Sequence, residues 1–373
     1  MLRYGIIGSG NMGQEHINNI RLLPGTVVSA VCDSDAQMRE KALELAGPDT
    51  KGFADHRDMM ASGLIDVIVL ASPNQTHVDV LLDVLPADLP ILAEKPLCTT
   101  SADCLRVINA AAGRRAPVWV AMEYRYMPPV ARLIEEVRKG TVGELKMLAI
   151  REHRYPFLGK VGDWNRFARN TGGTMVEKCC HFFDLMRLIT GAEAVRVYAS
   201  GSQALNHLDE NYGGETPDII DNSYTIVDFD NGVRAMLDLC MFAEASRDQE
   251  EITATGDRGK VECGVPSAVV TIGRRDPDYL KGGHPGHGGD ARLDRIPIPV
   301  DPKVMAAGHH FGSTFYQHKR FFEVIRSGET PEVTLHDGLK AVAIGEAAEQ
   351  SIRSGMPVDL CAAEEQAALT AIG

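Results

Sequence analysis

A glycine-rich motif close to the N-terminus constrains the fold of this chain more than any other feature. The motif, Gly8-Ser9-Gly10-Asn11-Met12-Gly13, follows an apolar run at 4–7 and opens a helix-like segment at 12–23. Glycines at this spacing let the backbone turn tightly and approach a pyrophosphate, which then lies at the positive end of the helix dipole. The motif alone is weak, because it also occurs as a simple strand-to-helix turn. Asp33 strengthens it, since it ends the second apolar run twenty residues after Gly13, where a carboxylate binds the ribose of a dinucleotide.

The residues around Asp33 also predict which dinucleotide binds. A carboxylate accepts hydrogen bonds from both ribose hydroxyls and repels a 2′-phosphate. Ser34 and Asp35 follow, so no arginine stands beside Asp33 to neutralise such a phosphate. The sequence therefore predicts NAD rather than NADP, and the alternative for Asp33 is a turn residue at a strand end.

Apolar runs alternate with helix-like segments through the first third of the chain. The runs lie at 4–7, 27–32, 67–71, 91–93 and 118–122, and the helix-like segments include 12–23, 36–45 and 77–85. Almost continuous apolar strands separated by helices are typical of a parallel sheet that is covered on both faces. We therefore expect residues 1–122 to form a doubly wound α/β domain of the Rossmann type, which binds the dinucleotide.

The order of predicted strands and helices changes after residue 122. A helix is expected at 129–139, and alternating strands at 145–151, 195–201, 223–229, 233–240 and 251–255, with an Asn231-Gly232 hairpin turn between two of them. Residues 123–373 should therefore form an α+β domain with an open, mostly antiparallel sheet that binds the substrate. The glycine- and charge-rich segment 273–295 is predicted as a long surface loop. Helices at 315–327 and 336–354 should follow, and the C-terminal helix could pack back on the first domain.

Charge and composition limit the kinds of molecule that the protein is expected to bind. The formal net charge is −13, which disfavours nucleic acid and anionic membranes. No apolar stretch approaches the roughly 20 residues that span a bilayer, and the N-terminus lacks the features of a signal peptide. The eight cysteines contain no CxxC pair, which suits reduced thiols. We therefore expect a cytoplasmic protein with a small-molecule substrate.

Several further motifs carry a resemblance to a known family. Ser72-Pro73-Asn74-Gln75-Thr76-His77 and Glu94-Lys95-Pro96 follow the third and fourth apolar runs, at the carboxyl ends where such sheets bind ligands. The chain also contains a glycine-led segment from Gly172 to Asp184, the stretch Glu123-Tyr124-Arg125 with Pro128, and the ending 328–358. Together these motifs resemble the Gfo/Idh/MocA family of glucose–fructose oxidoreductases, inositol dehydrogenases and rhizopine catabolism proteins, over essentially the whole chain.

The resemblance implies an NAD-dependent dehydrogenase that transfers a hydride between nicotinamide and a secondary hydroxyl carbon of a polyol or sugar. It implies that Lys95 lies near the nicotinamide and the substrate hydroxyl, that His181 is the general acid/base, and that Glu177 replaces the family's catalytic aspartate. The implied cofactor-binding residues are Gly8, Gly10, Asn11, Met12, Gly13, Asp33, Ser72, Pro73, Asn74, His77, Glu94 and Lys95. The predicted substrate contacts are Lys95, Tyr124, Arg125, Trp164, His181 and Asp184. Trp164 is included because an aromatic face packs well on a sugar ring, and its alternative is a core residue.

The chemistry of these side chains suits that reaction. Imidazole has an ordinary pKa of about 6.5 and can accept the hydroxyl proton, while a lysine ammonium stabilises the developing alkoxide. On one helix, Glu177, His181 and Asp184 would share a face at i, i+4 and i+7. The sequence leaves alternatives open: Glu177 as the partner of Thr174 in a capping box, His181 as a core residue, and Asp184 as a solvated helix residue. Thr171, Glu177 and Cys179 depart from the family's glycine, aspartate and glycine.

The remaining expectations concern metals, assembly and rival functions. His284, His287, His309 and His310 lie in the late loops with Asp290, but without a paired motif, so no metal is predicted. The open sheet must bury its apolar face, and the resemblance implies a homodimer or homotetramer. The rival functions are an NAD-dependent glycoside hydrolase of the same fold and a non-catalytic nucleotide-sensing regulator. Lys95 together with His181 argues against the regulator, because a sensor needs no acid/base pair.

Overall fold

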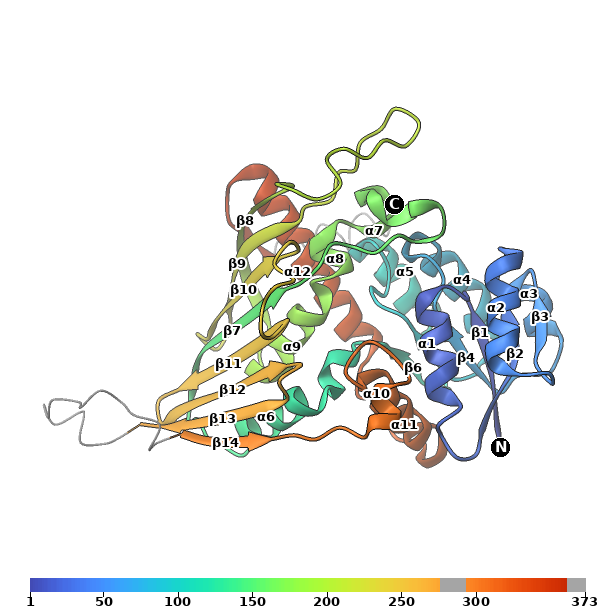
Figure 1. Ribbon diagram of the computed structural model, residues 1–373, viewed down its shortest axis with the longest axis horizontal. Coiled ribbons are helices and arrows are strands. Elements are labelled where there is room, and N and C mark those ends of the chain that lie inside the picture. Colours follow the sequence, from blue (N-terminus) through green and yellow to red (C-terminus); the bar gives the residue numbers. More distant parts are fainter. Residues whose placement is uncertain (276–292, 361–373) are drawn as a thin grey trace, which may run out of the picture.

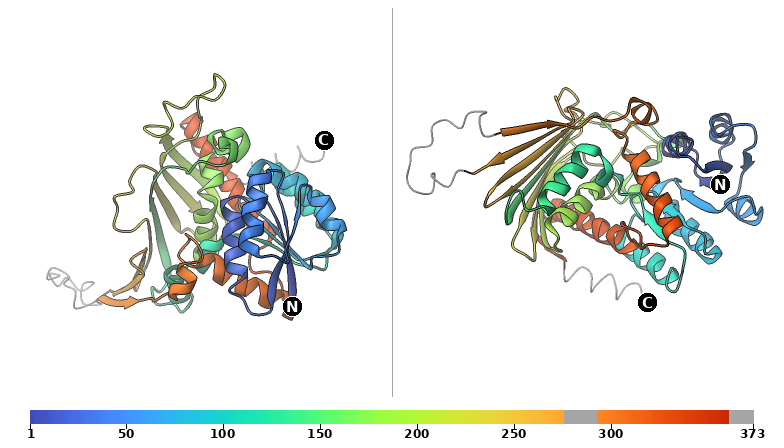
Figure 2. Two further views of the ribbon diagram at one scale, coloured as in Figure 1. Left: turned by 45° about the vertical axis from the view of Figure 1, so that its right-hand side comes forward. Right: turned by 90° about the horizontal axis from the view of Figure 1, so that it is seen from below.

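Two β-sheets, with helices packed between them, organise the molecule. The computed structural model of the chain describes residues 1–275 and 293–360. The N-terminal sheet and its helices form one side of the molecule, and a larger sheet forms the other (Figures 1 and 2). No helix in these two ranges combines the length and apolar character that a bilayer span requires.

The N-terminal sheet is parallel throughout and has the strand order β3-β2-β1-β4-β5-β6. Its strands are β1 (Leu2–Ile7), β2 (Thr26–Cys32), β3 (Lys51–Phe53), β4 (Val67–Leu70), β5 (Ile91–Ala93) and β6 (Val118–Val120). The helices of this half are α1 (Asn11–Ile20), α2 (Ala36–Ala46), α3 (His56–Ala61), α4 (His77–Val84) and α5 (Ser101–Ala110). This arrangement confirms the predicted doubly wound fold. Only β3 was not predicted, because its Lys-Gly-Phe sequence is largely exposed and carries no apolar run.

The larger sheet has the order β14-β13-β12-β11-β7-β10-β9-β8-β15 and is antiparallel except where β7 pairs with β10. It consists of β7 (Leu145–His153), β8 (Ala194–Ser202), β9 (Asn222–Phe229), β10 (Arg234–Cys240), β11 (Glu250–Gly256), β12 (Gly259–Val265), β13 (Val269–Arg274), β14 (Leu293–Pro297) and β15 (Val358–Asp359). The open, mostly antiparallel sheet is thus confirmed. Gly232 adopts a φ of +83° in the predicted hairpin turn between β9 and β10.

The sequence did not predict strands β12 to β15. Strand β12 alternates Val261, Cys263 and Val265 with Lys260, Glu262 and Gly264, a short period-two pattern that the prediction missed. The segment predicted as a long loop, 273–295, begins inside β13 and ends inside β14, which corrects the prediction at both ends. Between those strands, residues 276–292 lie outside the described residues, and so do His284, His287 and Asp290.

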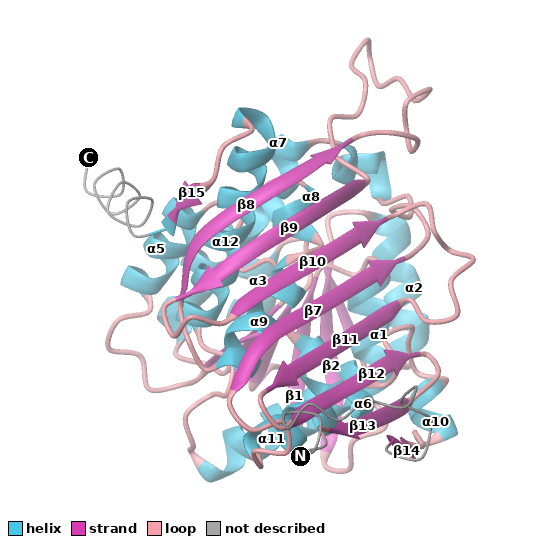
Figure 3. Cartoon of the chain, turned by 90° about the vertical axis from the view of Figure 1, so that its left-hand side faces the viewer, coloured by secondary structure: helices cyan, strands magenta, loops and turns pink. Residues whose placement is uncertain are grey.

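Helices cover one face of the larger sheet and leave the other open (Figure 3). The covering helices are α6 (Pro128–Arg138), α8 (Thr174–Glu177), α9 (Cys180–Thr190) and α12 (Leu335–Ser354). Along β9, side chains alternate between this covered face and the open face, so Val227 is buried while Tyr224 is 66% and Ile226 47% exposed. Apolar side chains thus remain on the open face.

The last helices join the two halves. Helix α11 (Ser313–Ser327) packs on α1, where His318 lies 2.8 Å from His16, nitrogen to nitrogen. Helix α12 packs on α5, and the backbone N–H of Ser101 donates to Glu346. The remaining α-helices of the described residues are short: α7 (Ala168–Thr171) and α10 (Pro302–Met305). The C-terminal ends of β1, β4 and β5 therefore face residues that come from the second half.

Candidate active site

The glycine motif forms an open cradle at the start of α1. Gly8 has a φ of +90°, and a Cβ there would lie 2.4 Å from the Ser72 nitrogen; at Gly13 a Cβ would lie 2.1 Å from the Gly8 oxygen. At Gly10, by contrast, a Cβ would meet no atom within 4 Å, and α1 has no side-chain N-cap. The first turn of α1 thus keeps free N–H groups beside open space, which suits a pyrophosphate.

Asp33 is fixed at the end of β2 beside this cradle. Its two carboxylate oxygens accept from the backbone N–H groups of Ser9 (2.7 Å) and Asp35 (2.9 Å). Arg39 donates to the Asp33 carbonyl rather than to the carboxylate, so it does not neutralise the side chain. The cradle and its acceptor together fit a dinucleotide with free ribose hydroxyls.

A cleft of about 380 Å³ runs from this cradle towards the second half of the molecule. Most predicted cofactor-binding residues line it, together with two predicted for chemistry or substrate: Gly8, Gly10, Asn11, Met12, Asp33, Ser72, Pro73, Asn74, Glu94, Lys95, Trp164 and Glu177. Gly13 packs behind the cradle. His77 is fully buried between the carbonyl oxygens of Ser72 (3.0 Å) and Pro96 (2.9 Å), so it braces two loops of the cleft.

Lys95 lies at the carboxyl end of β5, inside a hydrogen-bonded frame. Its ammonium donates to the backbone carbonyl of Glu177 at 3.1 Å. The neighbouring Glu94 carboxylate accepts from the Lys95 N–H (3.1 Å) and lies 2.9 Å from the His16 ring nitrogen. Glu94 therefore braces the loop that holds Lys95.

The segment around Glu177 differs from the predicted single helix. The Thr174 carbonyl accepts from both Lys178 (3.0 Å) and Cys179 (3.3 Å), and this wide turn separates α8 from α9. The prediction that Glu177, His181 and Asp184 share one helix face is therefore wrong. The capping-box alternative is wrong too, because Thr174 donates to the Ile220 carbonyl and Gly173 is the N-cap of α8.

The Glu177 carboxyl instead lines the cleft. One of its oxygens, Oε2, is buried and has no hydrogen-bond partner among the described residues. Burial raises the pKa of Glu177 to about 6, although Lys95 and Lys160 act in the opposite direction. This carboxyl can therefore exist in either protonation state near neutral pH.

His181 lies on the first turn of α9, against Tyr124. The two rings stack with centroids 4.0 Å apart and an interplanar angle of 3°. Its Nδ1 is buried without a partner among the described residues. Burial, followed by the charges of Lys95 and Lys178, lowers the pKa of His181 well below its ordinary value. His181 is thus held neutral and able to accept a proton.

Two of the predicted substrate contacts bind each other instead. Arg125 and Asp184 form a buried ion pair in which Nε donates to Asp184 at 2.6 Å, and Arg125 also donates to the Glu332 carbonyl at 2.8 Å. Neither residue lines the cleft. Tyr124 lies beneath His181 and accepts a hydrogen bond of 2.6 Å from Lys178.

Sequence comparison decides the family. Residues 2–122 match the profile of the GFO_IDH_MocA oxidoreductase family's NAD-binding Rossmann fold, and residues 134–360 match that of its C-terminal alpha/beta domain. The chain belongs to the Gfo/Idh/MocA family. It is an NAD-dependent oxidoreductase, which confirms the predicted family, enzyme class and cofactor.

Individual relatives of this oxidoreductase cover almost its whole length. The uncharacterized oxidoreductase YrbE of Bacillus subtilis is 26% identical over 358 residues, which cover 95% of this chain and 96% of YrbE. The myo-inositol 2-dehydrogenase of Thermotoga maritima is 24% identical over 366 residues, 96% and 98% of the two chains. A levoglucosan dehydrogenase solved with NADH and levoglucosan has the same fold, with a TM-score of 0.81 at 18% identity over 96% and 99% of the chains.

A buried group of ionisable residues adjoins the site of this Gfo/Idh/MocA member. Among the described residues, Glu15, Glu123 and His310 bring three ligand-type atoms within 4.8 Å of one another. His310 Nδ1 lies 2.9 Å from Glu15, and the Thr314 hydroxyl lies within hydrogen-bond distance of both carboxylates. Although burial opposes it, the two carboxylates raise the pKa of His310 to about 9. A protonated imidazole fits these hydrogen bonds and cannot bind a metal through Nδ1. The absence of a metal stays a prediction.

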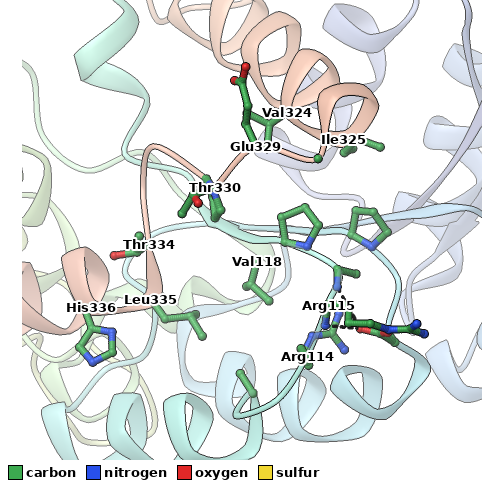
Figure 4. Close-up of a pocket in the computed structure, with 17 residues that line it drawn as sticks. Arg114, Arg115, Val118, Val324, Ile325, Glu329, Thr330, Thr334, Leu335 and His336 are labelled. Carbon is green, nitrogen blue, oxygen red and sulfur yellow. Dashed lines mark hydrogen bonds and ion pairs between the residues drawn. The ribbon is translucent and has the colours of Figure 1, made fainter.

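A larger cavity, of about 710 Å³, lies at the other end of the parallel strands (Figure 4). It opens beside the residues that start β5 and β6, Pro90 and Val118, and beside the α11–α12 connection. Its arginines are already engaged, since Arg115 pairs with Asp88 and Arg114 donates to the Leu89 carbonyl. Sheets of this type bind ligands at the carboxyl ends of their strands, so the smaller cleft is the candidate active site.

Sequence reasoning missed two lysines. Lys160 lines the cleft, and Lys178 is buried beneath His181 with Glu152 2.8 Å away. Lys160 stands in a segment without a recognisable motif. Lys178 occupies a variable position of the glycine-led segment, so neither carries a sequence signal.

Proposed function

We propose that this enzyme transfers a hydride between NAD and a secondary hydroxyl carbon of a polyol or sugar. The observation that carries the proposal is that Lys95 and Glu177, from the two halves of the molecule, line the same cofactor cleft. His181 does not line this cleft but is buried close enough to Lys95 for the lysine charge to lower its pKa. The three residue types supply a hydrogen-bond donor, a carboxylate and a neutral base for one hydroxyl group. The names of the inositol and levoglucosan dehydrogenases among its relatives support this substrate class.

Bound in the glycine cradle, NAD supplies the hydride acceptor. Lys95 donates a hydrogen bond to the substrate oxygen and stabilises its developing negative charge. His181, neutral because of burial and neighbouring cations, accepts the hydroxyl proton, and Nδ1 is the ring nitrogen left without a protein partner. When ionised, Glu177 stabilises the positive charge that the proton brings to this cluster. Stacking on Tyr124 fixes the plane of the His181 ring.

The test is NADH formation, followed by absorbance, with a panel of polyols and sugars. Exchange of His181 for alanine should lower kcat by about 10²- to 10⁴-fold with the best substrate, without changing the affinity for NAD. His336→Ala, an exposed histidine on α12, is the matched control and should keep full activity. If hydride transfer limits the rate and His181→Ala still has a near-normal kcat, then a group other than His181 accepts the hydroxyl proton. Hydrolysis of a glycoside to its sugar and aglycone, without net NADH formation, would instead show the hydrolase alternative.

We also propose that the enzyme forms homo-oligomers through the open sheet face. Cross-strand neighbours Tyr198, Ile226 and Met236 are 42%, 47% and 40% exposed there and form one apolar row across three strands. Apolar side chains gathered on one exposed face favour burial against another protein surface.

A further inference from the structure

Besides Lys41 and Lys95, the active-site cleft is lined by Lys160, whose ammonium has no hydrogen-bond or ion-pair partner among the described residues. Lys160 lines the cleft together with Lys95 and Glu177, and it precedes the 3₁₀ segment Val161–Arg166 that carries Trp164. Its ammonium makes no hydrogen bond or ion pair with any residue in 1–275 or 293–360, although its backbone carbonyl accepts from the N–H of Asp163. Two arginines that also influence Glu177 are occupied, since Arg154 has Glu152 at 3.6 Å and Arg166 has Glu210 at 2.8 Å. Among the described cations near Glu177, the Lys160 ammonium is therefore the one available to bind a ligand.

Glu177 does not close an ion pair with Lys160. Its Oε2 remains without a hydrogen-bond partner although both side chains line the same cleft. A ligand that occupies both must present a hydrogen-bond donor to the carboxylate and an acceptor to the ammonium. A hydroxyl group supplies the first. An anionic group is the acceptor that best stabilises an ammonium that has lost part of its water.

We propose that Lys160 binds an anionic group of the substrate, so that the enzyme oxidises a hydroxyl of a sugar or polyol that also carries a carboxylate or a phosphate. This inference rests on the proposed hydride transfer and narrows its substrate class. Lys160 is a specificity-determining residue in this proposal, whereas Lys95 and His181 act on the hydroxyl.

The charges around Lys160 support an anion at this position. Burial lowers the pKa of Lys160, and the charge of Glu177 opposes this shift. The nearby charge of Lys95 acts in the same direction as burial, so the two ammonium groups repel each other. The oxidised nicotinamide ring adds a further positive charge. An anion bound between these groups offsets the repulsion, which a neutral hydroxyl cannot do.

The pyrophosphate of the cofactor is not the anion in question. The residues that influence Lys160 electrostatically are Glu177, Lys95, Glu94 and Arg154, which lie on α8, at the end of β5 and just after β7. The pyrophosphate belongs at the glycine cradle before α1. Lys160 should therefore affect substrate affinity and leave the Michaelis constant for NAD unchanged.

Matched substrates test the inference. NADH formation is measured with D-glucose, D-glucuronate and D-glucose 6-phosphate, and with D-galactose and D-galacturonate. The same compounds are titrated calorimetrically into the NADH-loaded enzyme. We expect at least one anion to exceed its neutral counterpart in kcat/KM by about 10- to 100-fold, as a charge-assisted hydrogen bond allows. Lys160→Met should reduce that ratio by a similar factor, and Lys160→Arg should restore most of it. Lys319→Met, an exposed lysine on α11, is the matched control for net charge.

Each outcome decides the question. A preference for the neutral sugars, an unchanged ratio in Lys160→Met, or a rise in the NAD Michaelis constant in that variant would overturn the inference. Oxidation of neutral sugars alone would leave the proposed hydride transfer intact. Calorimetric binding of an anion that Lys160→Met abolishes, without NADH formation, would keep the inference and contradict the proposed reaction. Absence of anion binding to the wild-type enzyme would overturn the inference whether or not a sugar is oxidised. The carboxylate and phosphate arms separate the two sources of charge.

Discussion

Glu177 has surroundings that change its chemistry within the cleft. An exposed glutamate is ionised throughout the neutral range, but the pKa of Glu177 is raised to about 6 by burial in the cleft wall. Burial, with the charges of Lys95 and Lys178, shifts the pKa of His181 the opposite way, well below its ordinary value. The residue that titrates near neutrality in this site is therefore the carboxylic acid, although histidine is the side chain with the ordinary pKa in that range.

This assignment predicts the pH profile. Below about pH 6, Glu177 is protonated and cannot stabilise the proton on His181, so kcat/KM for oxidation should fall as pH drops through that value. Glu177→Gln should remove this acidic limb and lower kcat/KM about 10- to 100-fold at pH 8. Glu40→Gln, an exposed glutamate on α2, should retain both the limb and the rate. If the acidic limb persists unchanged in Glu177→Gln, then a group other than Glu177 causes it.

Asp33 predicts cofactor preference. Its carboxylate faces the cleft without a neutralising arginine side chain, so a 2′-phosphate should be repelled. Asp33→Asn should reduce the ratio of kcat/KM for NAD over NADP by roughly tenfold, as the loss of one charge–charge contact allows. Because Asp33 also holds the N–H of Ser9, the melting temperature is measured alongside; a change in melting temperature without a change in ratio would mean a purely structural role. Equal turnover with NADP in the unaltered enzyme would contradict the assignment.

At the scale of elements, sequence patterns predict the strands that are packed on both faces of the parallel sheet. Strands β1, β2, β4, β5 and β6 carry unbroken apolar runs, and all of them were predicted. Strand β12 alternates buried Val261, Cys263 and Val265 with half-buried Lys260 and Glu262, and the prediction missed this short pattern. The site follows the same rule: the glycine cradle, Asp33 and Lys95 have fixed motifs and their cleft was predicted. The break between α8 and α9, the pairing of Arg125 with Asp184 and the position of Lys160 depend on tertiary packing, which no local pattern encodes.

The β7–β11 pair carries a buried carboxyl with consequences for stability. Glu152 and Glu250 are cross-strand neighbours and are 0% and 4% exposed, with Lys178 bound to Glu152. Burial and then the charge of Glu152 raise the pKa of Glu250 from 4.5 to about 8. A pKa that is higher in the folded state stabilises the protein below the unfolded value, and this stabilisation is lost as pH rises to the folded value.

Glu250→Gln should therefore be more stable than the wild type at high pH only. Glutamine keeps the shape without the titrating proton, so the free energy of unfolding of the variant should stay level between pH 4.5 and 8 while that of the wild type falls. Above pH 8 the difference should exceed about 1.4 kcal/mol, the equivalent of one pKa unit. Urea unfolding at several pH values measures it. Glu251→Gln, on the same strand and paired with Arg151 on the open face, is the control and should show no such trend. A constant difference at all pH values would contradict the assignment.

At the scale of the whole molecule, the two sheets have different roles. The parallel sheet is covered on both faces and presents only its strand ends, which build the cofactor cleft. The larger sheet is covered on one face, where α8 and α9 carry Glu177 and His181, and its other face is open (Figure 3). Helices α11 and α12 fasten the two halves through His16–His318 and Ser101–Glu346. The catalytic groups of the two halves are thus held together by packing outside the cleft.

The open face predicts assembly. The row Tyr198–Ile226–Met236 stands between ion pairs such as Arg196–Asp228 and Arg151–Glu251, an apolar centre with a polar rim, as in stable protein interfaces. Light scattering at micromolar concentration should show a dimer or tetramer for the wild type. Ile226→Glu would place a carboxylate at the centre of the buried patch and should yield monomers, because an unpaired charge is costly to bury. Leu22→Glu, which is 39% exposed after α1 and away from this sheet, is the matched control and should leave the assembly intact. A monomeric wild type, or an Ile226→Glu variant with unchanged mass, would mean that this face is not the interface.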